Sequence, residues 1–149
     1  MKLADRLRAD FKQFSFVKDN ISRWSPVENT IFYNNNDTKL LHELGHAVCR
    51  HTNFTQDIEL LHLERDAWEK AREIGIKYDI KISNKSIENA MDEYREWLYQ
   101  RSLCPGCNQT GLQNQSDGRY ECLNCNNIWI ANDARNCSLK RRKITKNTL

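Results

Sequence analysis

The segment His42-Glu43-Leu44-Gly45-His46 constrains this chain more than any other, because it is an H-E-x-x-H motif. Side chains four residues apart lie on one face of an α-helix, so the two histidines can reach one metal ion. Glu43 lies about 100° around the helix from His42, where its carboxylate can contact a water molecule at the metal. The motif therefore predicts a helix with His42 and His46 as zinc ligands and Glu43 as the general base of a hydrolase.

The residues around the motif predict an α+β fold: a short sheet, the motif helix and two further long helices. Apolar residues at helical spacing predict helices at 3–14, about 39–50 and about 56–77, and one that begins after Ser83 or Ser86. Aromatic and β-branched residues predict strands at 14–17, 21–24 and 30–33. Asp37 or Thr38 is expected to cap the motif helix. Zinc proteases commonly bind peptide at a sheet edge beside the metal, so residues 30–33 are either such an edge or a core strand.

A catalytic zinc site uses three protein ligands, so a third ligand must follow the motif. The candidates are His51, Asp57, His62, Glu64 and Asp66. The metzincin extension requires Gly three residues and His six residues after the second histidine, but Cys49 and Thr52 occupy those positions. We choose Glu64, because it interrupts the apolar face of the 56–77 helix, where an unpaired carboxylate is costly to bury.

Close packing of the motif helix and the 56–77 helix is expected from their small residues. Gly45 lies inside a predicted helix, where it costs about 1 kcal/mol relative to Ala. Ala67 and Ala71 lie on the same face of the second helix as Glu64. A close approach of the two helices would explain all three small residues. No residue is favoured as the oxyanion-stabilising group, for which the candidates are Arg65, His62, Tyr78 and Tyr94.

The motif, followed by Glu-Arg-Asp-Ala-Trp-Glu-Lys-Ala at residues 64–71, resembles the ImmA/IrrE family of metallopeptidases. In that gluzincin-like family, an H-E-L-G-H helix precedes a helix with E-x-E-A-N-x-F-A; here Asp66 replaces a Glu and Trp68 replaces the Asn. The resemblance covers roughly residues 25–75. It implies a zincin-type fold with His42, His46 and Glu64 on zinc and Glu43 as base. It also implies a regulatory intracellular protease that acts on a protein such as a DNA-binding repressor.

SprT-like proteases, which include DNA-dependent repair proteases, are the second resemblance. They also join H-E-x-x-H to a C-terminal zinc ribbon, and residues 120–125 look like the end of such a ribbon. Their third ligand is normally a histidine in an H-G-x-x-W-like segment, which this chain lacks. The remaining alternative is a non-catalytic zinc-binding adaptor built on a decayed protease fold.

Two C-x-x-C pairs separated by 14 residues predict a second, structural zinc site. Its ligands are Cys104, Cys107, Cys122 and Cys125. The residue after each pair often needs a positive φ, which Asn108 and Asn126 tolerate. Disulfides are the disfavoured alternative in a cytosolic chain. Cys49 is interpreted as a core thiol and Cys137 as a free thiol.

Composition divides the chain into a peptidase domain at 1–100, a zinc ribbon at 101–133 and a basic, disordered tail at 134–149. The net charge is +3, but six basic and no acidic residues follow Asp133, so residues 1–133 carry −3. Nucleic-acid binding would therefore fall to the tail, and it is not favoured. No segment resembles a signal peptide or a membrane span, which favours a cytoplasmic protein with no membrane partner.

Overall fold

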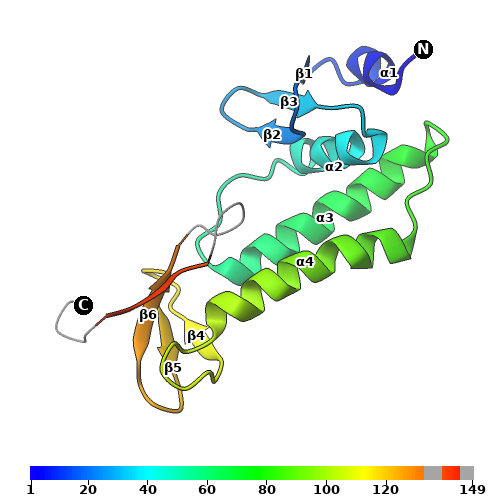
Figure 1. The fold of residues 1–149 in the computed structure, drawn as a ribbon. Helices are drawn as coiled ribbons and strands as arrows, with labels where there is room; N and C mark the ends of the chain where they lie inside the picture. Colours follow the sequence, from blue (N-terminus) through cyan, green and yellow to red (C-terminus); the bar gives the residue numbers. More distant parts are fainter. Residues whose placement is uncertain (133–138, 145–149) are drawn as a thin grey trace. The chain divides into compact units, whose positions relative to one another are not determined.

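The computed structural model describes residues 1–132 and 139–144, and its architecture is a mixed α+β fold. The chain forms two compact units. The first consists of Met1–Asn53 and His62–Asn89, and the second of Phe54–Leu61 and Ala90–Leu149. Helices α3 (Asp57–Ile76) and α4 (Asn84–Ser102) each contribute to both units (Figure 1). The second unit therefore includes the start of α3 and most of α4 in addition to the predicted ribbon.

The sheet of the first unit has three strands in the order β1-β3-β2. β1 (Ser15–Lys18) runs parallel to β3 (Thr30–Tyr33), and β2 (Arg23–Ser25) runs antiparallel to it. Ile31 on β3 is fully buried. Residues 30–33 are therefore the central strand, and the sheet edges are β1 and β2.

The first helix, α1 (Leu3–Asp10), is shorter than the sequence predicts. Its C-terminal residue is followed by Phe11, whose φ of −116° and ψ of 65° are not helical. Phe14 instead packs edge-on against Trp24 of β2, with 5.6 Å between ring centroids. The prediction that this helix extends to residue 14 is wrong. Phe14 packs against Trp24 of β2, a residue distant in sequence, and not against its own helix.

The motif lies on α2 (Asp37–Val48), as its spacing predicts. The cap, however, is Asn36 and not Asp37 or Thr38: its side-chain oxygen accepts a 3.0 Å hydrogen bond from the backbone N–H of Lys39. Asn36 keeps an extended backbone, so the helix begins at Asp37, two residues before the expected start at about residue 39. The buried face of α2 consists of Leu40, Leu41, Leu44 and Ala47.

Gly45 is the point at which α2 meets α3. A Cβ atom added to Gly45 would lie 2.2 Å from the backbone oxygen of Ala67. Ala67 and Ala71 are both fully buried. The expected close approach of the two helices is confirmed, and it brings Glu64, one turn before Ala67, alongside the motif.

The second unit contains a four-stranded antiparallel sheet in the order β4-β5-β6-β7. Its strands are β4 (Gly111–Gln113), β5 (Tyr120–Cys122), β6 (Ile128–Ala131) and β7 (Arg141–Ile144). Tyr120 and Trp129 are buried and stack with a centroid separation of 5.5 Å.

The prediction that residues 134–149 form a disordered tail is wrong for residues 141–144, which form β7. Ile144 lies opposite Ile128 in the β6–β7 ladder, so backbone pairing and an apolar contact hold this basic segment in the sheet. A charged edge strand lacks the apolar pattern that reveals a strand in a sequence. Cys137 lies outside the described residues, as do the other residues of 133–138 and 145–149. No helix in residues 1–132 and 139–144 combines the length and apolar content that crossing a membrane requires.

Candidate metal centres

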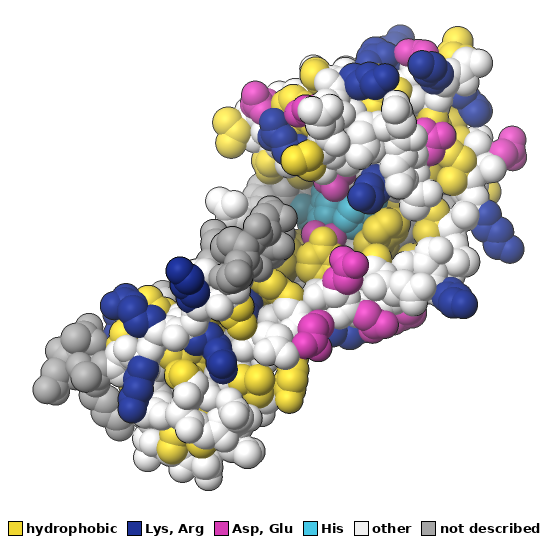
Figure 2. All heavy atoms as spheres, viewed as in Figure 1, with side chains coloured by type: hydrophobic (Ala, Val, Ile, Leu, Met, Phe, Trp, Pro, Cys, Tyr) yellow, Lys and Arg dark blue, Asp and Glu magenta, His cyan; other side chains and the backbone are white. Residues whose placement is uncertain are grey.

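The structure brings together His42 and His46 from α2 and Glu64 from α3. Nε2 of His42 lies 2.8 Å from Oε2 of Glu64, and Nε2 of His46 lies 3.2 Å from Oε1 of the same carboxylate. The two Nε2 atoms are 3.2 Å apart. A tetrahedral zinc ion with bonds of about 2.0–2.1 Å holds its ligand atoms about 3.3 Å apart. Small adjustments would therefore fit these three donors around one ion. Figure 2 shows histidine side chains at the surface, with acidic side chains beside them.

The surroundings favour the protonation states that metal ligands need. Burial lowers the pKa of His42, which favours neutral imidazole. Burial alone would raise the pKa of Glu64, but hydrogen bonds from His42 and His46 outweigh it and hold the pKa far below its usual range. At neutral pH the site therefore presents neutral imidazole next to an ionised carboxylate.

Glu43 stands beside these ligands without joining them. Burial is the main cause that raises the pKa of Glu43 to about 7. A backbone N–H of Trp24 donates a hydrogen bond to its carboxylate. Trp24 belongs to β2, so the sheet edge at the motif is β2, and the alternative that residues 30–33 form this edge is wrong. A carboxylate whose pKa is near neutrality is suited to general-base chemistry.

Two further side chains contact the histidines of the motif: His51, which the sequence offered only as a candidate third ligand, and Trp68, which it did not assign to the site. Nδ1 of His46 lies 2.8 Å from Nδ1 of His51. The ring of His42 stacks on Trp68, with 4.1 Å between centroids and 23° between planes. The sequence gives only weak signals for these contacts: His51 follows the helix at no recognised spacing, and Trp68 fits the apolar face of the 56–77 helix.

The other candidates for the third ligand lie elsewhere. His62 and Asp66 are exposed. Asp66 Oδ2 is 4.0 Å from Nε2 of His51. Asp57 belongs to the second unit. Cys49 is half-buried at the end of α2, not in the core.

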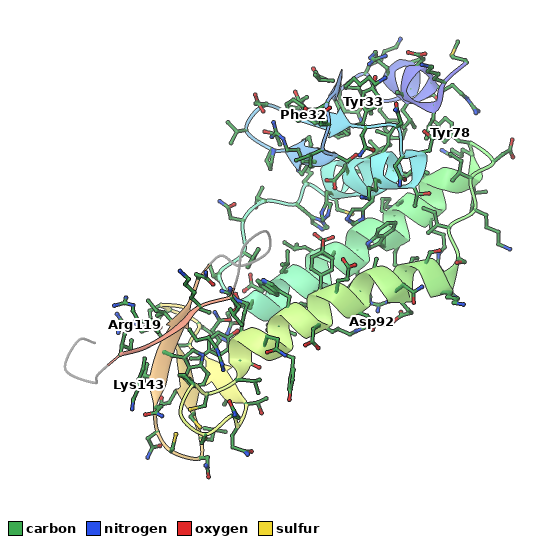
Figure 3. All side chains as sticks on the ribbon, in the orientation of Figure 1. Phe32, Tyr33, Tyr78, Asp92, Arg119 and Lys143 are labelled. Carbon is green, nitrogen blue, oxygen red and sulfur yellow. The ribbon has the colours of Figure 1, made fainter. Side chains whose placement is uncertain are left out.

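The oxyanion candidates Arg65 and Tyr78 are each engaged by another residue. Arg65 pairs with Glu88 at 2.9 Å. Tyr78, labelled in Figure 3, donates a 2.6 Å hydrogen bond to Asp10. Burial, followed by this bond, raises the pKa of Tyr78 to about 12. The phenol thus serves the packing of α1 and remains protonated at neutral pH.

The four predicted cysteines form a second group in the second unit. The Sγ atoms of Cys104 and Cys125 are 3.5 Å apart, as are those of Cys107 and Cys122. Disulfide sulfurs would be about 2.05 Å apart, whereas a tetrahedral zinc ion with Zn–S bonds of about 2.3 Å separates its sulfurs by about 3.8 Å. The four free thiols therefore match a metal site and not a pair of disulfides.

The backbone around these cysteines has the geometry of two knuckles. Asn108 has a φ of 59° and Asn126 a φ of 60°, which confirms the prediction from their side chains. Gly106 N–H donates to Sγ of Cys104, and Asn124 N–H to Sγ of Cys122, each at 3.4 Å. Burial would raise the pKa of Cys104, but the backbone N–H groups of Cys107 and Gly106 outweigh it and lower the pKa to about 6. These donors favour thiolate, the form that binds zinc.

Asp57 has a structural role in the second unit. Its Oδ2 accepts a 2.8 Å hydrogen bond from Nε of Arg101 and a 2.5 Å bond from the hydroxyl of Tyr120. Trp129 donates its indole N–H to the backbone carbonyl of Arg101 at 3.0 Å. This buried network joins the start of α3 and the end of α4 to the ribbon sheet.

Asp57→Asn should lower the free energy of unfolding by about 2 kcal/mol, since charge-assisted hydrogen bonds become neutral ones within a buried network. Urea denaturation of the full chain measures the loss. Asp117→Asn is the matched control, because Asp117 pairs with Arg119 at 3.8 Å while 46% exposed, where such pairs contribute little. Equal losses in the two variants would contradict the proposed role of the Asp57 network.

The structure thus contains two groups of side chains that could each hold a metal ion: four cysteines, and two histidines with a glutamate. The comparison with protein-family models finds no match to this chain. Comparisons with curated proteins and with solved structures likewise find none.

Proposed function

We propose that this chain is a zinc-dependent peptidase that hydrolyses peptide bonds in a protein substrate. The observation that carries the proposal is the convergence of His42, His46 and Glu64 within ligand distance, with Glu43 next to them and not bonded to them. If the two histidines had no metal-binding role, they would not be expected to lie against a buried glutamate of another helix. A structural metal site would not need the additional, half-buried carboxylate of Glu43.

The chain's own residues have separable roles in this reaction. A zinc ion held by the three ligands would supply a Lewis acid that polarises the scissile carbonyl. Glu43 would accept a proton from the attacking water at its carboxylate and deliver it to the leaving amine. The N–H of Trp24 would hold that carboxylate in position.

The position of β2 supports a polypeptide as the substrate. β2 pairs with β3 along one side only, so its other side is an edge at which an extended peptide can add as a further strand. Trp24 at this edge contacts Glu43, so a peptide bound there would pass the proposed base. The resemblance to the ImmA/IrrE family extends the proposal to a regulatory target, such as a DNA-binding repressor.

A DNA-associated peptidase of the SprT-like kind is the second candidate, and one observation favours it. The basic residues at 140–143 are carried by the ribbon, and Lys143 lies on its edge strand β7 (Figure 3). Charged edge strands also serve to prevent aggregation, which explains the same residues without DNA. Cleavage stimulated by DNA would favour this candidate, and cleavage of a helix-turn-helix repressor would favour the first.

Metal analysis combined with an unfolded-protein cleavage assay tests the proposal. The wild-type chain should contain two zinc ions, of which Glu64→Ala should lose one together with all cleavage, because two histidines alone bind zinc weakly. Cys104→Ser should lose the other ion. Cleavage of unfolded casein, followed by mass spectrometry, should stop after chelation and return with zinc.

Glu73→Ala is the matched control, since Glu73 is an exposed glutamate on the same helix. It should keep both zinc ions and full cleavage. If Glu64→Ala kept both ions while His62→Ala or His51→Ala lost one, the choice of third ligand would be wrong.

A further inference from the structure

We infer that His51 is a positioning residue for His46, a role that rests on the proposed metal centre. The two Nδ1 atoms lie 2.8 Å apart. Both side chains are largely shielded from solvent, with 12% of His46 and 10% of His51 exposed. At this distance and burial the pair forms a hydrogen bond that water competes for only weakly.

The direction of this hydrogen bond follows from the chemistry of imidazole. A neutral ring carries its proton on one nitrogen only. Nε2 of His46 points at Glu64 and His42, so as a metal ligand it must be unprotonated. The proton of His46 therefore lies on Nδ1 and is donated to Nδ1 of His51. A bond of this kind fixes the tautomer and the ring orientation of a metal-binding histidine.

His51 completes a short relay of contacts that ends in a carboxylate. Because its Nδ1 accepts from His46, its own proton lies on Nε2. That nitrogen lies 4.0 Å from Oδ2 of Asp66, on the exposed side of α3. Because the Asp66 side chain is 67% exposed, its carboxylate adds only weakly to this preference, which the hydrogen bond with His46 sets.

The backbone around His51 is held from two sides, which places the ring. The chain changes direction after α2 at Arg50, which has a left-handed φ of 59°. The N–H of His51 donates to the carbonyl of His46, and its own carbonyl accepts from the indole N–H of Trp24, each at 3.0 Å. Trp24 also contacts Glu43, so β2 positions both the proposed base and the residue that orients His46.

His42 has no comparable partner, so the two histidines of the motif are oriented in different ways. Its Nδ1 has no hydrogen-bond partner among the described residues. The stacked ring of Trp68 is what restrains His42 instead. The loss of His51 should therefore affect one ligand only, which makes its contribution measurable.

The test uses two substitutions of His51 in the full chain with its ribbon zinc in place. His51→Phe keeps a planar ring but removes the acceptor, whereas the side-chain oxygen of His51→Asn can accept near the position of Nδ1. Zinc affinity at the motif is measured by competition with a chromophoric chelator. His51→Phe should weaken zinc binding by about 10–100-fold. His51→Asn should restore most of the affinity.

Cobalt(II) provides a second readout that a merely structural role would not change. Its visible absorption reports on ligand geometry, so the spectrum of His51→Phe should differ from that of the wild type, and the spectrum of His51→Asn should resemble it. His62→Phe is the control, because His62 is an exposed histidine of α3. It should leave affinity and spectrum unchanged. If His51→Phe does not fold, His51→Leu is measured in the same way.

The outcomes separate this inference from the proposed peptidase. Equal zinc affinity and equal cobalt spectra in the wild type and His51→Phe would overturn the role of His51 alone. Equal losses in His51→Asn and His51→Phe would also overturn it, since a restored acceptor would then have no effect. A wild-type chain that binds zinc only at its cysteines would instead contradict the proposed metal centre itself.

Discussion

Glu43→Gln should lower kcat/KM for peptide hydrolysis by about 10²–10⁴-fold, the contribution typical of a general base. Glutamine has nearly the same shape but cannot accept the proton of the attacking water. Glu43 does not contribute to the three-ligand group, so the zinc content should remain that of the wild type. Initial rates on a peptide found by mass spectrometry, together with metal analysis, measure both effects.

The control for this variant is Glu73→Gln, which makes the same chemical change on the exposed side of α3. It should leave the rate unchanged. A Glu43→Gln protein that retained full activity would contradict the peptidase mechanism. One that lost its motif zinc would show that Glu43 acts in metal binding and not as a base.

The same variant should reveal the energetic cost of burying Glu43. Burial raises its pKa from 4.5 to about 7, so the folded state holds the proton more tightly than the unfolded state does. The associated stability is present below pH 4.5 and is lost as the pH rises through about 7. Phenanthroline is used to remove zinc from the motif site while the cysteine site keeps its zinc. Under these conditions Glu43→Gln should be more stable than the wild type at pH 8. The excess should approach about 3 kcal/mol and vanish near pH 4.5. Urea denaturation at both pH values measures it.

Gly45→Ala should lower the free energy of unfolding by about 3 kcal/mol, at the upper end of overpacking costs. The new methyl group would lie 2.2 Å from the backbone oxygen of Ala67, so α2 and α3 must separate. Alanine's better helix propensity, worth about 1 kcal/mol, offsets only part of this cost. Separation would also move Glu64 away from the two histidines, so zinc binding at the motif should weaken together with stability.

Thr38→Ala is the matched control for Gly45→Ala, since it introduces alanine near the start of the same helix, at a half-buried position. It should change stability and zinc affinity little. If Gly45→Ala were as stable as the wild type and bound zinc as tightly, the close contact of α2 with α3 would not be what holds Glu64 in place.

Local pattern predicted the elements of the first unit because each carries its own periodicity. The strand at Thr30–Tyr33 has the predicted bounds. The bounds of α2 differ from prediction by two residues at each end, and those of α3 by one residue at each end. Phe14 and Asn36 show where local pattern fails. Phe14 fits a helical stripe, but its contact with Trp24 lies outside that stripe, and Asn36 competes with two other residues that could cap the same helix.

Some residues of the proposed metal centre could likewise be predicted from local pattern, and others could not. Spacing alone placed His42, Glu43 and His46 on one turn, and the polarity of a helix face pointed to Glu64. His51 and Trp24 carried no such signal, because their contacts with His46 and Glu43 depend on a turn at Arg50 and on the course of β2.

The sequence by itself determined the proposed ligands that share one element, namely His42 and His46 on a helix and the two cysteines of each C-x-x-C pair, since their spacing follows from the geometry of that element. It also determined the positive φ at Asn108 and Asn126, which is a property of the local backbone. Only the tertiary structure decided which strand edge lies beside Glu43, that residues 141–144 join a sheet, and that His51 contacts His46. Each of these depends on contacts between elements. The free energy of such contacts is set by several segments packing together, so it produces no periodic residue pattern within any single segment.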